Sequence, residues 1–106
     1  MMHKLVVLYS EPENPSAFID YYTTHHLPLA AQLPGLLAWR YSIEVSETSD
    51  QQAPYFAIFE AEFEDVHAFR SAMSSPQGQA VTADVPNYAT GGATVIDYAI
   101  SGGETS

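Results

Sequence analysis

The stretch from Phe18 to Gly35, FIDYYTTHHLPLAAQLPG, constrains the fold of this chain more than any other. At about 100° per residue its apolar side chains form one stripe, which predicts an amphipathic helix over residues 16–33. Pro28 lacks a backbone N–H and biases Leu27 away from helical angles, so we expect a kink or local unwinding here. Pro34 and Gly35 end the helix, because glycine can take a positive φ. The central stripe consists of Phe18, Tyr22, Leu29 and Leu33, with His26 and Ala30 on its border.

Four other segments have the patterns of strands. Residues 3–10 are apolar and β-branched, which is typical of a strand covered on both faces. Residues 36–47 and 55–63 alternate along the chain and predict an antiparallel hairpin, joined by a polar connection over residues 48–54. Residues 93–100 form the last strand.

Shorter helices are predicted between the hairpin and the last strand. Asp65 is a good N-cap for an amphipathic helix. The Ser-Pro pair at residues 75–76 begins another piece, which continues to about Asp84. The Asn-Pro pair at residues 14–15 begins the first helix in the same way, and Ser16 is an equally plausible cap.

The order β-α-β-β-α-β predicts a ferredoxin-like α+β fold, in which a four-stranded antiparallel sheet carries its helices on one face. The strands have large apolar residues on both faces, and soluble monomers rarely expose an apolar sheet face. We therefore expect a homodimer that pairs two such sheets. The length predicts one domain over residues 1–100, followed by a flexible tail over residues 101–106.

Composition restricts the partners. Three basic against thirteen acidic residues give a net charge of −10, so no basic patch can form, and neither nucleic acid nor an anionic membrane is expected. The absence of cysteine excludes disulfides and thiolate chemistry. No apolar run approaches the length of a membrane span and the N-terminus lacks a signal-peptide pattern, which predicts a cytoplasmic protein.

Two blocks of the sequence resemble the signature of the EthD family. The first is Tyr21-Tyr22-x-x-x-His26-x-Pro28-Leu29 followed by Leu33-Pro34-Gly35-Leu36, and the second is SPQGQA at residues 75–80 followed by DVPN at residues 84–87. The resemblance covers nearly the whole chain. It implies a dimeric α+β barrel with a largely apolar cleft between the helices and the sheet, and it places His26 at the family's histidine position.

The resemblance is less specific for an activity. The family is named for an accessory role in ethyl tert-butyl ether degradation. Relatives in the wider superfamily include polyketide cyclases, dehydratases, decarboxylases, isomerases and cofactor-independent monooxygenases. Chemistry of this kind is carried out in the cleft with few polar side chains.

His26 is the strongest candidate for proton transfer. It lies one helical turn after Tyr22, so the two side chains can meet, and an imidazole exchanges protons near neutral pH. Asp84 could orient this histidine or stabilise its charged form, as carboxylates do in acid–base sites. The alternatives are a buried histidine bonded to a backbone carbonyl, and an aspartate that caps the turn after it. We therefore take His26, Tyr22 and Asp84 as the candidate catalytic residues.

Aromatic side chains of the strands are the candidates for substrate contact. One strand face must line the helix-covered cleft, so we expect Tyr9, Trp39 and Tyr41 to contact substrate, with ordinary core or interface packing as the alternative. His25 and Tyr21 lie on the opposite border of the stripe and are expected to be structural or half-exposed.

Neither a metal nor an organic cofactor is expected. The adjacent His25 and His26 diverge by about 100° on a helix and cannot hold one ion together. The sequence contains no glycine-rich phosphate loop, dinucleotide fingerprint or nucleophile elbow. Three classes of function stay open: cofactor-independent acid/base catalysis on a small hydrophobic ring or polyketide-like compound, non-catalytic binding for an oxygenase pathway, and haem or oxygen chemistry.

Overall fold

The computed structural model describes residues 1–48 and 51–104. Within them, four strands form one antiparallel sheet in the order β2-β3-β1-β4. The strands are β1 (His3–Tyr9), β2 (Ala38–Ser42), β3 (Ala57–Phe63) and β4 (Ala93–Ala99). The helical elements are α1 (Pro15–Tyr21), a π-helical turn (Tyr22–His26), α2 (Leu27–Ala30), α3 (Val66–Ser74), α4 (Pro76–Asp84) and a 3₁₀ turn (Val85–Asn87).

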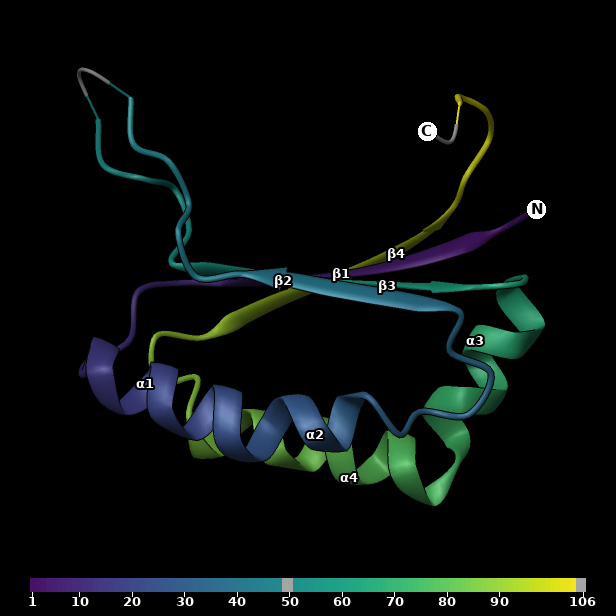
Figure 1. The fold of residues 1–106 in the computed structure, drawn as a ribbon, viewed down its shortest axis with the longest axis horizontal. Coiled ribbons are helices and arrows are strands. Elements are labelled where there is room, and N and C mark those ends of the chain that lie inside the picture. The colour runs from purple at the N-terminus through teal and green to yellow at the C-terminus, as the bar shows by residue number, and fades with distance from the viewer. Residues whose placement is uncertain (49–50, 105–106) are drawn as a thin grey trace.

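The helices lie on one side of the sheet and leave the other side open (Figure 1). This arrangement confirms the predicted ferredoxin-like fold. No helix among residues 1–48 and 51–104 is long and apolar enough to cross a membrane.

The core lies between the sheet and the helices. Every second residue of the two central strands is buried on that side, as the period of a strand requires. The buried residues are His3, Leu5, Val7 and Tyr9 of β1, and Ala57, Phe59, Ala61 and Phe63 of β3. The other side of β1 is only half-buried, because no helix covers it.

The hairpin is shorter than the sequence pattern predicts. β2 covers Ala38–Ser42 rather than residues 36–47, and its pairing with β3 ends at Ser42 and Ile58. Residues 43–48 and 51–55 turn away from the sheet on its open side (Figure 1). Residues 49–50 of the predicted polar connection lie outside the described residues, as do residues 105–106 of the predicted tail.

Polar side chains begin the helices at the predicted places. In α1, α3 and α4 the backbone N–H of the third residue donates to the side chain of the N-cap residue. The pairs are Ala17 N to Asn14 Oδ1 (3.1 Å), Ala68 N to Asp65 Oδ1 (2.8 Å) and Gly78 N to Ser75 Oγ (3.0 Å). A Cβ at Gly78 would lie 2.2 Å from the carbonyl oxygen of Ala72, so glycine is needed where α4 approaches the end of α3.

The long helix predicted over residues 16–33 is interrupted before Pro28 rather than at it. In the π-helical turn the backbone N–H of Leu27 donates to the carbonyl of Tyr22, five residues earlier. The hydroxyls of Thr23 and Thr24 donate to backbone carbonyls one turn back, those of Ile19 (2.8 Å) and Asp20 (2.6 Å). These bonds help to satisfy carbonyl oxygens where the hydrogen-bond register changes.

The π-helical turn also changes which side chains are buried. It contains one more residue than an α-helical turn, so the residues after it are rotated relative to a regular helical wheel. His26 is 3% exposed and Ala30 1%, whereas Leu29, predicted at the centre of the stripe, is only half-buried. The wheel therefore placed Leu29 wrongly, because it assumed one helical period throughout.

Candidate functional site

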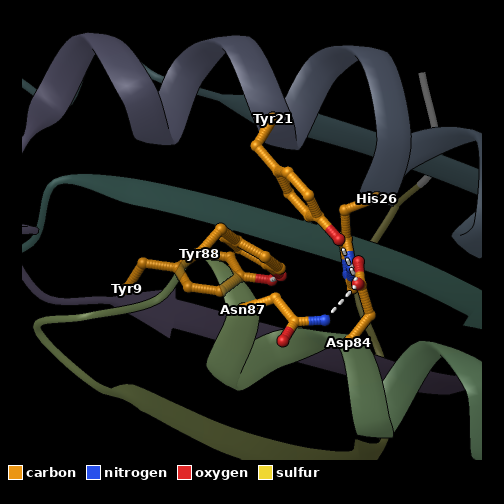
Figure 2. A network of polar contacts seen from close by, with 6 residues as sticks. All are labelled: Tyr9, Tyr21, His26, Asp84, Asn87 and Tyr88. Carbon is orange, nitrogen blue, oxygen red and sulfur yellow. Dashed lines mark hydrogen bonds and ion pairs between the residues drawn. The ribbon is translucent and has the colours of Figure 1, made fainter.

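Asp84, the last residue of α4, binds three side chains (Figure 2). Its Oδ2 lies 2.9 Å from Nδ1 of His26. Its Oδ1 accepts hydrogen bonds from the hydroxyl of Tyr21 at 2.6 Å and from the side-chain amide of Asn87 at 3.0 Å. Tyr21 ends α1, His26 ends the π-helical turn and Asn87 ends the 3₁₀ turn. The site is therefore assembled where these helical segments meet.

The surroundings favour an ionised aspartate and a neutral histidine. Burial alone would raise the pKa of Asp84, but the hydrogen bonds from Tyr21, Asn87 and His26 outweigh burial and hold this pKa below its ordinary value. Burial lowers the pKa of His26, and the hydrogen bond and charge of Asp84 only partly oppose this. Near neutral pH the pair is therefore a carboxylate beside an uncharged imidazole.

The hydrogen bond to Asp84 also selects one form of the histidine ring. Because the carboxylate can only accept, the neutral imidazole of His26 carries its hydrogen on Nδ1. Its Nε2 then has a free lone pair. An imidazole held in this way is oriented and chemically suited to take a proton at Nε2.

A cavity of about 310 Å³ lies between the helices and the sheet, and His26 forms part of its wall. Of the twelve lining side chains, nine are apolar, and the polar ones are Tyr9, His26 and Thr82. The apolar residues are Leu5, Val7, Ala30, Leu33, Phe59, Met73, Val81, Val85 and Val95. A largely apolar pocket with a few polar groups is the usual form of a small-molecule site.

Three buried tyrosines pack beside this histidine. The hydroxyls of Tyr9 and Tyr88 are 2.6 Å apart, and the ring of Tyr88 lies 4.6 Å from that of His26, centroid to centroid. The ring of Tyr22 stacks on that of His26 at 5.7 Å, as the i, i+4 spacing predicts. The hydroxyl of Tyr22 is buried without a hydrogen-bond partner among the described residues. Burial raises the pKa of both Tyr22 and Tyr88, so these phenols stay protonated.

The structure brings some of the sequence candidates together and leaves others apart. His26 and Asp84 are paired and Tyr9 lines the cavity. Trp39 and Tyr41 are 39% and 43% exposed on β2 and do not belong to the cavity wall formed by the described residues. Tyr41 instead meets the ring of Tyr22 edge-on at 5.9 Å. The substrate contacts of these strand residues stay predictions.

Three residues of the site were not among the sequence candidates. Tyr21 and Asn87 both bond Asp84, and Tyr88 lies between His26 and Tyr9. Tyr21 and Asn87 belong to the two sequence blocks that resemble the EthD signature, so a signal was present for them. No comparable signal marked Tyr88, which follows the second block directly.

Metal ligands do not gather at this site. Among residues 1–48 and 51–104, no group of three or more His, Asp or Glu side chains could hold a metal ion. His25 is exposed, and its ring lies 4.8 Å from that of Tyr21.

The fold and the site define a class of protein: a ferredoxin-like α+β domain with a His–Asp pair beside an apolar cavity. The model of the EthD domain matches residues 10–92, and the chain belongs to the EthD family. A relative from Rhodococcus erythropolis, an 11.0 kDa protein in the thcB–thcC intergenic region, is 32% identical over 96 residues, which cover 90% of this chain and 91% of the relative.

Solved structures share the fold, and one of them is an EthD-family protein. An ethyl tert-butyl ether degradation (EthD) family protein from Bacillus halodurans has a TM-score of 0.87 and 26% identity, over 94% of this chain and 99% of that one. A dimeric ferredoxin-like protein from Thermobifida fusca has a TM-score of 0.73 and 15% identity, over 94% and 92% of the two chains.

Two enzymes also share the fold, at 15–16% identity. Hydroxynitrile lyase from Passiflora edulis has a TM-score of 0.73 at 16% identity, over 98% and 97% of the two chains. A cofactor-independent oxygenase from Streptomyces nogalater has a TM-score of 0.67 at 15% identity, over 96% and 95%.

Proposed function

We propose that this EthD-family protein is an acid/base catalyst that needs no cofactor and acts on a small hydrophobic ring or polyketide-like compound. Cyclisation, dehydration, decarboxylation and isomerisation are reactions of this type. In each of them His26 would move a proton, while the apolar cavity orients the substrate and excludes water.

The observation that carries the proposal is the bond between Nδ1 of His26 and Oδ2 of Asp84, at 2.9 Å, with the same imidazole in the cavity wall. This arrangement fixes the ring and its tautomer, and it leaves Nε2 as the proton acceptor. The volume suits a small ligand: about 310 Å³ is roughly twice the ~150 Å³ cavity that holds a benzene molecule in an engineered protein. We infer a substrate of one or two rings.

The enzymes of similar fold support catalysis as a use for this scaffold, although at 15–16% identity they share only the fold. The cofactor-independent oxygenase also supports a second candidate, in which oxygen reacts with a substrate that has lost a proton. A non-catalytic binding protein with the same cavity is the remaining alternative. It differs by needing no proton transfer at His26.

Deuterium exchange tests the proposal directly. One- and two-ring compounds with an acidic C–H bond are incubated with the protein in heavy water, and proton NMR follows the loss of that hydrogen. We expect exchange with the natural protein and none above background with His26→Gln, which keeps a polar side chain of similar reach. A bound compound that exchanges equally with both proteins, or with neither, would leave a binding role.

The open face of the sheet supports a homodimer as the working form. Ile96 and Tyr98 are 45% and 44% exposed there, next to the half-buried Val6. The only cation on β1, Lys4, is held on that face by Glu60 at 2.9 Å and lies 3.8 Å from Glu62. Pairing of two such faces would cover this apolar surface. The ferredoxin-like protein of similar fold from Thermobifida fusca is dimeric, which supports a homodimer here.

A further inference from the structure

The cavity provides no positive charge for an anionic substrate. None of its twelve lining residues is a lysine or arginine. Its histidine is neutral, because burial lowers the pKa of His26. The charge that contacts this histidine is negative, the carboxylate of Asp84. An anion entering this apolar space would lose its water and gain no counter-ion, which is costly.

The same site has phenolic hydrogens without acceptors. The bond between Tyr9 and Tyr88 uses one hydrogen, so the hydroxyl that accepts in this pair keeps its own. The buried hydroxyl of Tyr22 has no partner among the described residues. The three rings lie 5.4–5.6 Å from one another, centroid to centroid, and Tyr9 belongs to the cavity wall. A buried donor without a partner is unfavourable unless a ligand or water supplies an oxygen.

We propose that the cavity binds an uncharged, enolisable carbonyl compound whose oxygen accepts a hydrogen bond from the hydroxyl of Tyr9, the one tyrosine of this cluster in the cavity wall formed by the described residues. This inference rests on the proposed proton transfer at His26 and names its substrate class. The C–H bond next to the carbonyl breaks and its proton moves to Nε2 of His26. The electron pair forms the C=C bond of an enolate, and the negative charge on oxygen is stabilised by the phenolic donor. Return of the proton to either end completes an exchange or an isomerisation.

This substrate class narrows the proposed chemistry. Decarboxylation starts from a carboxylate, which the charge of the site disfavours. Isomerisation, dehydration and cyclisation can all proceed through the enolate of a neutral ketone or aldehyde. A base, His26, and a phenolic donor, Tyr9, in the same cavity wall suit this second group of reactions.

Three matched probes test the inference by calorimetry: α-tetralone, its parent hydrocarbon tetralin, and tetralin with a carboxylate in place of the ketone. We expect the ketone to bind at least ~10-fold more tightly than the carboxylate, because the anion loses its hydration in the apolar cavity. Tyr9→Phe should weaken the ketone about fivefold, the usual effect of one lost hydrogen bond, and leave tetralin unchanged. Tyr55→Phe is the control and should change neither, because Tyr55 does not belong to the cavity wall formed by the described residues.

The outcomes separate this inference from the proposed function. Equal affinity for ketone and carboxylate would overturn the substrate class, even if His26-dependent exchange were found with other compounds. So would an equal loss of ketone and tetralin binding in Tyr9→Phe, because that points to altered packing. If the ketone bound more tightly than the carboxylate but exchanged no deuterium, the preference of the cavity for a neutral carbonyl compound would be supported. The catalytic role would be refuted. If none of the three probes bound, this inference would fail, while the deuterium-exchange experiment with His26→Gln would still decide the proposed function.

Discussion

Nδ1 of His26 lies 2.9 Å from Oδ2 of Asp84, although 58 residues separate the two in the sequence. One residue ends the π-helical turn and the other ends α4, so the pair exists only once both helical segments lie against the sheet. The same aspartate holds Tyr21 and Asn87. An arrangement with three donors around one carboxylate fixes the imidazole more firmly than a single bond would.

The charge of Asp84 should control the form of the histidine. In Asp84→Asn the amide can donate to Nδ1 as well as accept from it, so the Nδ1–H form of His26 loses its preference. We expect imidazole nitrogen NMR to show a larger share of the Nε2–H form. Exchange that depends on His26 should fall by roughly 10²-fold or more, the scale of general acid–base contributions.

Asp65→Asn is the matched control for that experiment. Asp65 caps α3 through the backbone N–H of Ala68, and asparagine caps helices as well as aspartate does. The control should keep both the tautomer and the exchange rate. A ring of His26 that stays in the Nδ1–H form in Asp84→Asn would show that the carboxylate does not set it.

Stability should respond to pH through His26. Its pKa in the folded protein lies below the ordinary 6.5, so between these two values the unfolded chain binds more protons than the native one. Stability is therefore full above about pH 6.5 and falls as the pH decreases through the folded value. Urea unfolding at a series of pH values should show this loss in the natural protein and a smaller one in His26→Gln.

His67→Gln is the control, because His67 is exposed and lies outside the network around Asp84. This variant should lose stability with falling pH as the natural protein does. Asp84 affects the stability in a separate, more acidic pH range. Its folded pKa lies below the ordinary 3.8, so its contribution is present above 3.8 and disappears only in more acidic solution. Identical pH profiles for the natural protein and His26→Gln would contradict the lowered pKa of His26.

Two tyrosine variants should differ in stability although both remove one hydroxyl. In Tyr88→Phe the hydroxyl of Tyr9 loses its 2.6 Å partner, and we expect a loss of about 1–2 kcal/mol. In Tyr22→Phe a buried hydroxyl without a partner is removed, which should leave the stability unchanged or raise it by up to ~1 kcal/mol. Urea unfolding of both variants measures the difference. A loss in Tyr22→Phe as large as in Tyr88→Phe would mean that its hydroxyl has a partner, such as a buried water.

The sequence was sufficient to predict the fold because its signals are local. Strand alternation and the caps Asn14, Asp65 and Ser75 depend on neighbouring residues only, and the element order then leads to the ferredoxin-like fold. The π-helical turn was not predictable, because a helical wheel contains no information about a change in hydrogen-bond register. That change moved Leu29 out of the centre of the buried side.

The candidate site was predictable only in part. The motif blocks pointed to His26 and to Asp84, and the contact between them depends on how α4 lies against the first helix. The positions of Trp39 and Tyr41 depend on how far the helices extend over β2, which strand alternation cannot reveal. The network around Asp84 likewise joins residues that are far apart in the chain.

The proposed dimer predicts that a charge on the open sheet face will separate the subunits. Ile96 lies opposite Val6 on that face and is 45% exposed. Ile96→Asp would bury an unpaired carboxylate in the interface of two chains that each already carry a net charge of −10, so we expect the dissociation constant to rise at least ~10-fold. Leu37→Asp is the control, since Leu37 is 57% exposed in the segment before β2 and outside the sheet face. Sedimentation velocity should give a dimer for the natural protein and the control, and monomers for Ile96→Asp. A monomeric natural protein at micromolar concentration, or a dimer that tolerates Ile96→Asp unchanged, would exclude the open face as the interface.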